Sequence, residues 1–203
     1  HDLDFWHHAV EPKVAAYLGQ LATSGWRALD ELRTAGLIKG IGAGINEAGM
    51  IPRFLDLVDL DFFLLALRYT LMEHDTLDDE LPYCERRDVG IVVGGVFSSG
   101  ITATGTIPGA KYNYADATAE VLAKVRRIEA VCARHDVALP AAALQFPLGH
   151  PAVASVIPGG YSPAHVAANI EHMRATIPAE FWAELKQEGL IRSDAPLPAG
   201  GEA

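Results

Sequence analysis

Hydrophobic residues follow two alternating patterns along this 203-residue chain. Short, continuously apolar segments are typical of buried strands, and four of them occur, at residues 37–43, 60–67, 89–93 and 153–157. The segments around them carry apolar residues at helical spacing instead. Strands that are apolar on both faces and alternate with helices predict an α/β fold, in which helices cover a parallel sheet.

Apolar spacing and end signals place the predicted helices. The clearest covers residues 118–135, with one face formed by Val121, Leu122, Val125, Ile128 and Cys132. Ser24 is a suitable start for a helix that ends at Gly36, and Asn46 is a suitable N-cap for a short helix. Further helices are predicted at three positions marked by proline, which are Pro140, Pro163 and Pro178.

The number of strands leaves two architectures open. Four parallel strands cannot close an eight-stranded barrel by themselves, so a doubly wound open sheet competes with part of a barrel. The glycine signature of dinucleotide-binding open sheets is absent, because Gly40, Gly42 and Gly44 lie on the predicted strand itself. Residues 1–203 are predicted to form a single domain, with a loose tail at 194–203 that is rich in Pro, Gly and Ala.

Composition and charge narrow the classes of partner. The chain has 26 acidic and 16 basic residues, for a formal net charge of −10, and no stripe of Lys and Arg. Nucleic acids and anionic membranes are therefore poor partners, and no apolar run approaches the roughly 20 residues of a membrane helix. Cys84 and Cys132 form no CxxC pair and indicate reduced thiols of a cytoplasmic protein. The histidines near the start lack a matched set of further ligands, so we expect no metal site.

Candidate ligand-binding residues follow the strands, because ligands of βα folds bind at the carboxyl ends of the strands. They are Asn46, Arg68 and the segments 94–100 and 158–162. The Gly and Ser residues of the last two segments would let backbone N–H groups approach a phosphate closely. Tight turns explain the same composition, so phosphate binding remains one of two alternatives here.

Five blocks in this order resemble the aldo/keto reductase family. They are IKGIGAGINE at 38–47, LLALRYTLM at 64–72, GGVFSSGI at 94–101, ALQFPL at 143–148 and HPAVASVIPG at 150–159. The similarity is to the branch of D-threo-aldose, L-fucose (L-galactose) and pyridoxal 4-dehydrogenases. It implies that the chain is the C-terminal portion, about strands five to eight, of a TIM (β/α)8 barrel.

The resemblance also implies which catalytic residues are present. The family combines a Tyr, an Asp and a Lys from its first three strands with a His after the fourth. His1, in the pair His1-Asp2, stands where that His is expected. The other three have no counterpart here, and Tyr69 does not replace the missing Tyr. We therefore expect the chain to be inactive alone. It begins without Met, which both processing and a missing N-terminal segment explain.

The cofactor-binding set is implied in the same way. Asn46 matches the residue that holds the nicotinamide carboxamide, and Ser98, Ser99 and Gly100 match the pyrophosphate loop. Asn169 matches an adenine contact, and Arg68 and Gly160 complete the expected set. The family's Gln on the sixth strand aligns with Ala66, which leaves one amide contact without a counterpart.

Cofactor choice depends on two further positions. Gly159 and His165 occupy the places of cations that often bind the 2′-phosphate of NADP. Because charge-assisted bonds contribute about 1.5–3 kcal/mol each, NAD is the expected cofactor in preference to NADP.

The implied activity is NAD-dependent oxidation of an aldose or a related small alcohol. The alternative is a non-catalytic cofactor-binding or assembly fragment of such a barrel. Because four strands leave two unpaired sheet edges, the expected protein partner is the missing N-terminal half of the barrel or a second copy of this chain.

Overall fold

A parallel four-stranded sheet forms the centre of the computed structural model, which describes Asp4 and residues 11–199. Its strands, in spatial order, are β1 (Gly42–Ile45), β2 (Phe62–Ala66), β3 (Gly90–Gly94) and β6 (Val153–Ile157). The predicted α/β class and parallel pairing are confirmed. The sheet is open, because within the described residues β1 and β6 pair with one neighbour each and not with each other. The described strands therefore do not close into a barrel.

The first strand lies further along the chain than its apolar pattern predicts. The predicted segment is 37–43, whereas β1 covers Gly42–Ile45. Before β1, the Asp61 carboxylate accepts the backbone N–H of Ile41 at 2.6 Å, and the Ile41 carbonyl accepts the N–H of Asp61 at 2.8 Å. Leu37 is 73% exposed. The first residues of the apolar run therefore lead into the sheet without forming part of the strand.

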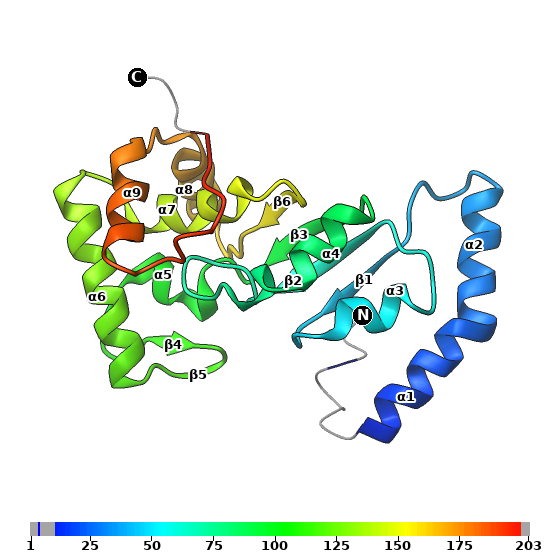
Figure 1. Cartoon of the computed structure of the whole chain (residues 1–203). Helices are drawn as coiled ribbons and strands as arrows, with labels where there is room; N and C mark the ends of the chain where they lie inside the picture. The colour runs from blue at the N-terminus through cyan, green and yellow to red at the C-terminus, as the bar shows by residue number, and fades with distance from the viewer. Residues whose placement is uncertain (1–3, 5–10, 200–203) are drawn as a thin grey trace.

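Helices lie at both ends of the sheet (Figure 1). Near β1, α1 (Glu11–Gln20) continues through a π-helical turn, η1 (Leu21–Gly25), into α2 (Trp26–Thr34). The prediction that Ser24 starts this helix is wrong, because Ser24 lies inside the π turn. Near β6, the other end holds α6 (Ala119–Arg134), α7 (Leu139–Gln145), α8 (Pro163–Arg174) and α9 (Ala179–Gln187).

Shorter elements connect the strands. They are α3 (Met50–Leu55), η2 (Asp75–Leu77), α4 (Glu80–Arg86), η3 (Ser98–Gly100), α5 (Ile101–Thr104), the hairpin of β4 (Lys111–Tyr112) and β5 (Ala115–Asp116), and η4 (Phe146–Gly149). Asn46 is not an N-cap, because α3 begins only at Met50. Gly49 caps it instead with a φ of 82°, a left-handed conformation that glycine adopts without strain.

The two faces of the sheet differ in how they are covered. On the helical face, Phe63, Leu65, Ile91 and Val93 are fully buried. On the opposite face, Phe62 is 39% exposed and Ile157 is 47% exposed. Gly42 makes room for the Phe62 ring there, since an added Cβ would lie 2.5 Å from that ring. No described helix seals this face.

The end of the chain packs against the domain as far as the structure describes it. Ala195 is fully buried, and the backbone of residues 196–198 passes so close to Gly149 that an added Cβ would meet it at 2.5–2.7 Å. The predicted loose tail therefore does not begin at residue 194, and residues 200–203 lie outside the described part. In that part no helix is long and apolar enough to cross a membrane.

Candidate functional site

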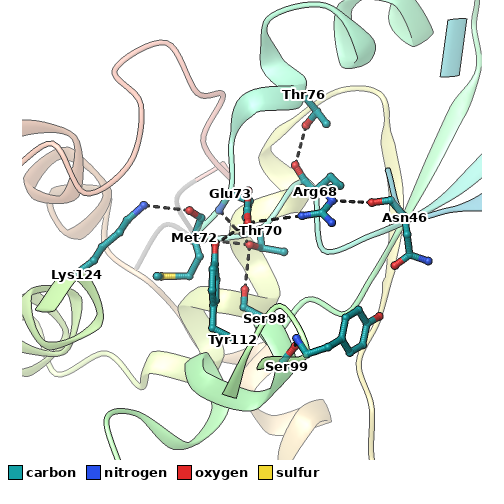
Figure 2. Close-up of polar contacts among 11 residues, drawn as sticks. Asn46, Arg68, Thr70, Met72, Glu73, Thr76, Ser98, Ser99, Tyr112 and Lys124 are labelled. Atoms are coloured by element: carbon teal, nitrogen blue, oxygen red, sulfur yellow. Dashed lines mark hydrogen bonds and ion pairs between the residues drawn. The ribbon is translucent and has the colours of Figure 1, made fainter. Parts of the chain in front are cut away.

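The predicted site residues lie just beyond the carboxyl ends of the four strands. Asn46 follows β1, Arg68 follows β2, Ser98 and Ser99 follow β3, and Gly159 follows β6. Because the strands are parallel, these ends meet along one edge of the sheet. Figure 2 shows the polar contacts that join the first three of them.

The segment after β2 is the centre of these contacts. The Nε of Arg68 donates to the backbone oxygen of Asn46 at 2.6 Å, which ties β2 to β1. The Thr70 hydroxyl lies 3.1 Å from that of Ser98, which ties β2 to the turn after β3. The backbone N–H groups of Met72 and Glu73 both donate to the Thr70 oxygen at 3.2 Å. The three strand ends therefore form one connected polar layer.

A residue that sequence reasoning missed holds Asn46 from the other side. The backbone N–H groups of Asn46 and Glu47 donate to Oδ2 of Asp4, at 2.7 and 2.8 Å. Asp4 and Asn46 are both buried. The sequence signal was the proximity of Asp4 to His1-Asp2, but nothing in it indicated a contact 42 residues away.

The serine turn after β3 has an unusual backbone. Ser98, Ser99 and Gly100 have φ values of 49°, 63° and 103°, all in the left-handed region. Such a conformation costs free energy for a residue with a side chain and commonly marks a functional constraint. The Ser98 side chain is buried against Thr70, whereas Ser99 is half-buried. A Cβ added to Gly100 would meet no atom within 4 Å, which leaves open space above it.

The β4–β5 hairpin, which the apolar pattern did not predict, packs beside the serine turn. Ser99 Oγ accepts the backbone N–H of Tyr114 at 2.9 Å. Tyr112 donates its hydroxyl to Glu73 at 2.6 Å, and Glu73 lies 3.8 Å from the Arg68 guanidinium. Burial, followed by the contact with Glu73, raises the pKa of Tyr112 above its usual range. Tyr112 is thus a neutral hydrogen-bond donor at physiological pH.

The other end of the site is a small cavity lined by α5, α8 and the turn after β6. Its volume is about 220 Å³, and its lining includes Phe97, Thr104, Gly159, His165, Asn169 and His172. Asn169 donates to the backbone oxygen of Gly159 at 3.2 Å, and the Ser162 hydroxyl caps α8 by accepting the N–H of His165. Gly160 lies directly beside His165 and Asn169. The structure therefore brings together Gly159, Gly160, His165 and Asn169, and no Lys or Arg lines this cavity.

Two other predicted features lie elsewhere. His1 lies outside the described residues. Tyr69 is fully buried in the core, 5.4 Å from Phe146 and 5.7 Å from His150 between ring centres. Burial raises its pKa above the usual range, and its hydroxyl has no partner among the described residues. That part of the chain also contains no group of three or more His, Cys, Asp or Glu residues that could hold a metal ion.

Comparison with known proteins agrees with this geometry. The model of the aldo/keto reductase family matches residues 1–189. Pyridoxal 4-dehydrogenase from Microbacterium luteolum is 45% identical over 167 residues, which cover 82% of this chain and 49% of that protein. D-threo-aldose 1-dehydrogenase from Pseudomonas sp is 40% identical over 169 residues, which cover 83% of this chain and 51% of that protein.

The same likeness extends to solved structures. The apo form of an aldo-keto reductase from Bacillus halodurans superimposes with a TM-score of 0.63 at 22% identity, over 83% of this chain and 56% of that one. The chain thus spans about half the length of the curated relatives it matches. Since the family model matches most of its residues, this chain belongs to the aldo/keto reductase family of oxidoreductases.

Proposed function

We infer that the chain is the cofactor-binding part of an NAD-dependent dehydrogenase that oxidises an aldose or a related small alcohol. The observation that carries this proposal is one continuous edge of the sheet. It begins at Asn46, passes the left-handed serine turn and ends in the cavity at Gly159 and Asn169. When bound, the nicotinamide supplies the acceptor for the hydride of the alcohol.

The residues present fit a dinucleotide. Backbone at Gly100 and Gly159 is approachable, because a Cβ added at either position would meet nothing within 4 Å. In this proposal the turn at Ser98–Gly100 holds the pyrophosphate, and Asn169 contacts the adenine. Asn46 holds the carboxamide. Arg68, which donates to the Asn46 carbonyl, belongs to the same carboxamide end of the site. Gly160 leaves space beside His165.

NAD is proposed over NADP because no cation lines the adenine-side cavity. A 2′-phosphate there would lack the charge-assisted bonds that a Lys or Arg supplies, each worth about 1.5–3 kcal/mol. Titration of the chain with both cofactors, followed by protein fluorescence, should give the lower Kd for NAD. Gly159→Lys should reverse or narrow that difference, and tighter binding of NADP by the unchanged chain would contradict the proposal.

Turnover is a separate matter. The resemblance assigns the Tyr, Asp and Lys of the active site to strands without a counterpart among these 203 residues, and it leaves His1 to orient the substrate oxygen. Loss of a catalytic acid lowers rates by orders of magnitude. The isolated chain should therefore reduce no NAD with L-fucose, L-galactose, D-arabinose or pyridoxal. Robust turnover by a preparation of verified mass would overturn this assignment of roles.

The proposal includes a protein partner, which is the N-terminal barrel half or a second copy. It rests on the exposed Phe62 and Ile157 and on the two unpaired sheet edges. A cytoplasmic location is part of the same proposal, since Cys84 and Cys132 are unpaired thiols. If the chain binds NAD but the completed barrel shows no turnover, the alternative of a non-catalytic cofactor-binding fragment replaces the dehydrogenase.

A further inference from the structure

The backbone of Asn46 is held on both sides by charged side chains from other parts of the chain. Oδ2 of Asp4 accepts two consecutive N–H groups, from Asn46 at 2.7 Å and from Glu47 at 2.8 Å. The Nε of Arg68 donates to the Asn46 carbonyl at 2.6 Å. Asp4 precedes α1, whereas Arg68 follows β2, so neither belongs to the strand that ends at Asn46.

These contacts join the Asn46 backbone to two charged side chains. Hydrogen bonds to ionised groups are about twice as strong as neutral ones, and here they fix the peptide planes before and after Asn46. With both planes fixed, the direction in which the Asn46 side chain leaves the backbone is fixed as well. In Figure 2 that side chain extends away from the Arg68 contact.

Asp4 has a feature that fold stability alone does not explain. It is 4% exposed, and its second oxygen, Oδ1, has no hydrogen-bond partner among the described residues. A buried carboxylate oxygen without a partner destabilises the folded state. A buried polar group without a partner is uncommon in a folded protein, and here it lies next to a predicted ligand contact.

We propose that Asp4 and Arg68 are positioning residues for the nicotinamide end of the cofactor. Together they hold the Asn46 side chain in the direction that meets the carboxamide before the cofactor arrives. Nothing in the family-level comparisons assigns this role to Asp4. The inference rests on the proposed function, because it takes Asn46 as the carboxamide contact.

The role predicts a difference between two ligands. NAD⁺ carries the nicotinamide, whereas ADP-ribose carries only the remainder of the molecule. Asp4→Ala and Arg68→Gln should each weaken NAD⁺ binding about tenfold, which corresponds to about 1.4 kcal/mol, and leave the Kd of ADP-ribose within about twofold. A merely structural role would weaken both ligands alike. Isothermal titration of both ligands measures the difference.

Asp61 supplies a matched control. Its carboxylate also accepts a backbone N–H next to β1, that of Ile41 at 2.6 Å, but at the opposite end of the strand. Asp61→Ala should lower stability without changing the ratio of the two Kd values. The isosteric Asp4→Asn keeps the shape of the side chain, and it replaces Asp4→Ala if that variant does not fold. Equal loss of both ligands in the Asp4 variants, or loss of neither, overturns the proposal.

Hydrogen exchange separates this proposal from the function on which it rests. The amides of Asn46 and Glu47 should exchange at least tenfold faster in Asp4→Asn, while those of Ile91 and Val93 should not change. If the unchanged chain binds neither NAD⁺ nor ADP-ribose, the proposed function fails. The hold on Asn46 is still decided by exchange, since unaltered protection of Asn46 and Glu47 in the variant overturns it.

Discussion

The two faces of the central sheet have similar residues and different surroundings. Phe63 on the helical face is fully buried and meets Phe54 edge-on at 5.9 Å between ring centres. Phe62, its neighbour in sequence, points to the other face and is 39% exposed. Both faces are apolar, and parallel sheets in known folds are covered on both sides. The comparison teaches that neighbouring phenylalanines on one strand meet different surroundings, because the described part of the chain packs against only one face of the sheet.

The open sheet also limits where site residues can lie. In (β/α)8 barrels the strand ends surround the active site from all sides. In the described residues Asn46, Ser98 and Gly159 follow strands of one open sheet, so they lie along an edge and not around a ring. Under the proposed function, this edge binds the cofactor and further groups of the active site are expected from outside it.

The largest expected effect tests the comparison directly. Phe63→Ala should lower the free energy of unfolding by about 3–5 kcal/mol, because it leaves a cavity in a packed core. Phe62→Ala, the matched control on the adjacent residue, should lower it by less than about 2 kcal/mol, because that ring is already partly in water. Urea denaturation of both variants measures the difference. Equal losses would mean that a partner buries the open face in solution.

Sequence patterns predicted the sheet well and the contacts between its strand ends poorly. Each of the four apolar runs contains or overlaps a strand, and the runs at 60–67 and 153–157 contain β2 and β6 in full. The first predicted strand begins several residues too early, because the Asp61 side chain accepts the backbone N–H of Ile41 just before strand pairing begins. Apolar periodicity depends on local composition and contains no information on such long-range hydrogen bonds.

For the candidate site too, the sequence predicted the position of residues along the chain better than the contacts between distant segments. Gly159, His165 and Asn169 line one cavity because they belong to consecutive parts of the chain, the turn after β6 and α8, and their cofactor roles stay a prediction. The N-cap role of Asn46 was wrong, since its backbone is held by Asp4 and Arg68 while Gly49 starts the helix. The β4–β5 hairpin was missed because its strands have two residues each and no apolar alternation. In the structure Asn113 and Tyr114, with φ values of 47° and 65°, form the turn, and Asn113 is the residue type there that commonly adopts this conformation.

A buried histidine makes the packed side sensitive to acid. His74 lies 5.3 Å from Phe146 between ring centres, and burial, assisted by Lys124 and Arg192, lowers its pKa to about 4. In the unfolded chain this ring takes up a proton near pH 6.5. Between pH 6.5 and about 4 the unfolded chain therefore binds a proton that the folded chain does not bind. The free energy of unfolding should decrease as the pH is lowered across this window, by about 3 kcal/mol in total.

His74→Gln isolates this contribution. A glutamine at this position does not titrate. The difference in unfolding free energy between the variant and the unchanged chain should therefore change with pH between pH 6.5 and 4 and stay constant above pH 7.5. His150, whose pKa burial also lowers, and Glu80, whose pKa burial raises, contribute to both proteins and cancel in the difference. A difference that stays constant with pH would show that His74 has the same pKa in the folded and unfolded chains, which would contradict the prediction.

The smallest expected effect compares two helix caps. Thr118 caps α6 by accepting the N–H of Val121, and Ser162 caps α8 by accepting that of His165. The chemistry is the same, yet α6 buries Val125, Ile128, Val131 and Cys132, whereas α8 has no fully buried residue and packs against α7. Loss of a cap typically lowers stability by about 1 kcal/mol where the helix unfolds together with the core. Thr118→Ala should therefore lower the global free energy of unfolding by about 1 kcal/mol. Ser162→Ala should change it by less than about 0.5 kcal/mol and instead speed amide exchange within α8 alone, because a weakly packed helix opens locally. Equal global losses would indicate that α8 is fastened to the core as firmly as α6. In that case α8 would belong to the packed part of the molecule, and the contrast in packing would apply only to the two faces of the sheet.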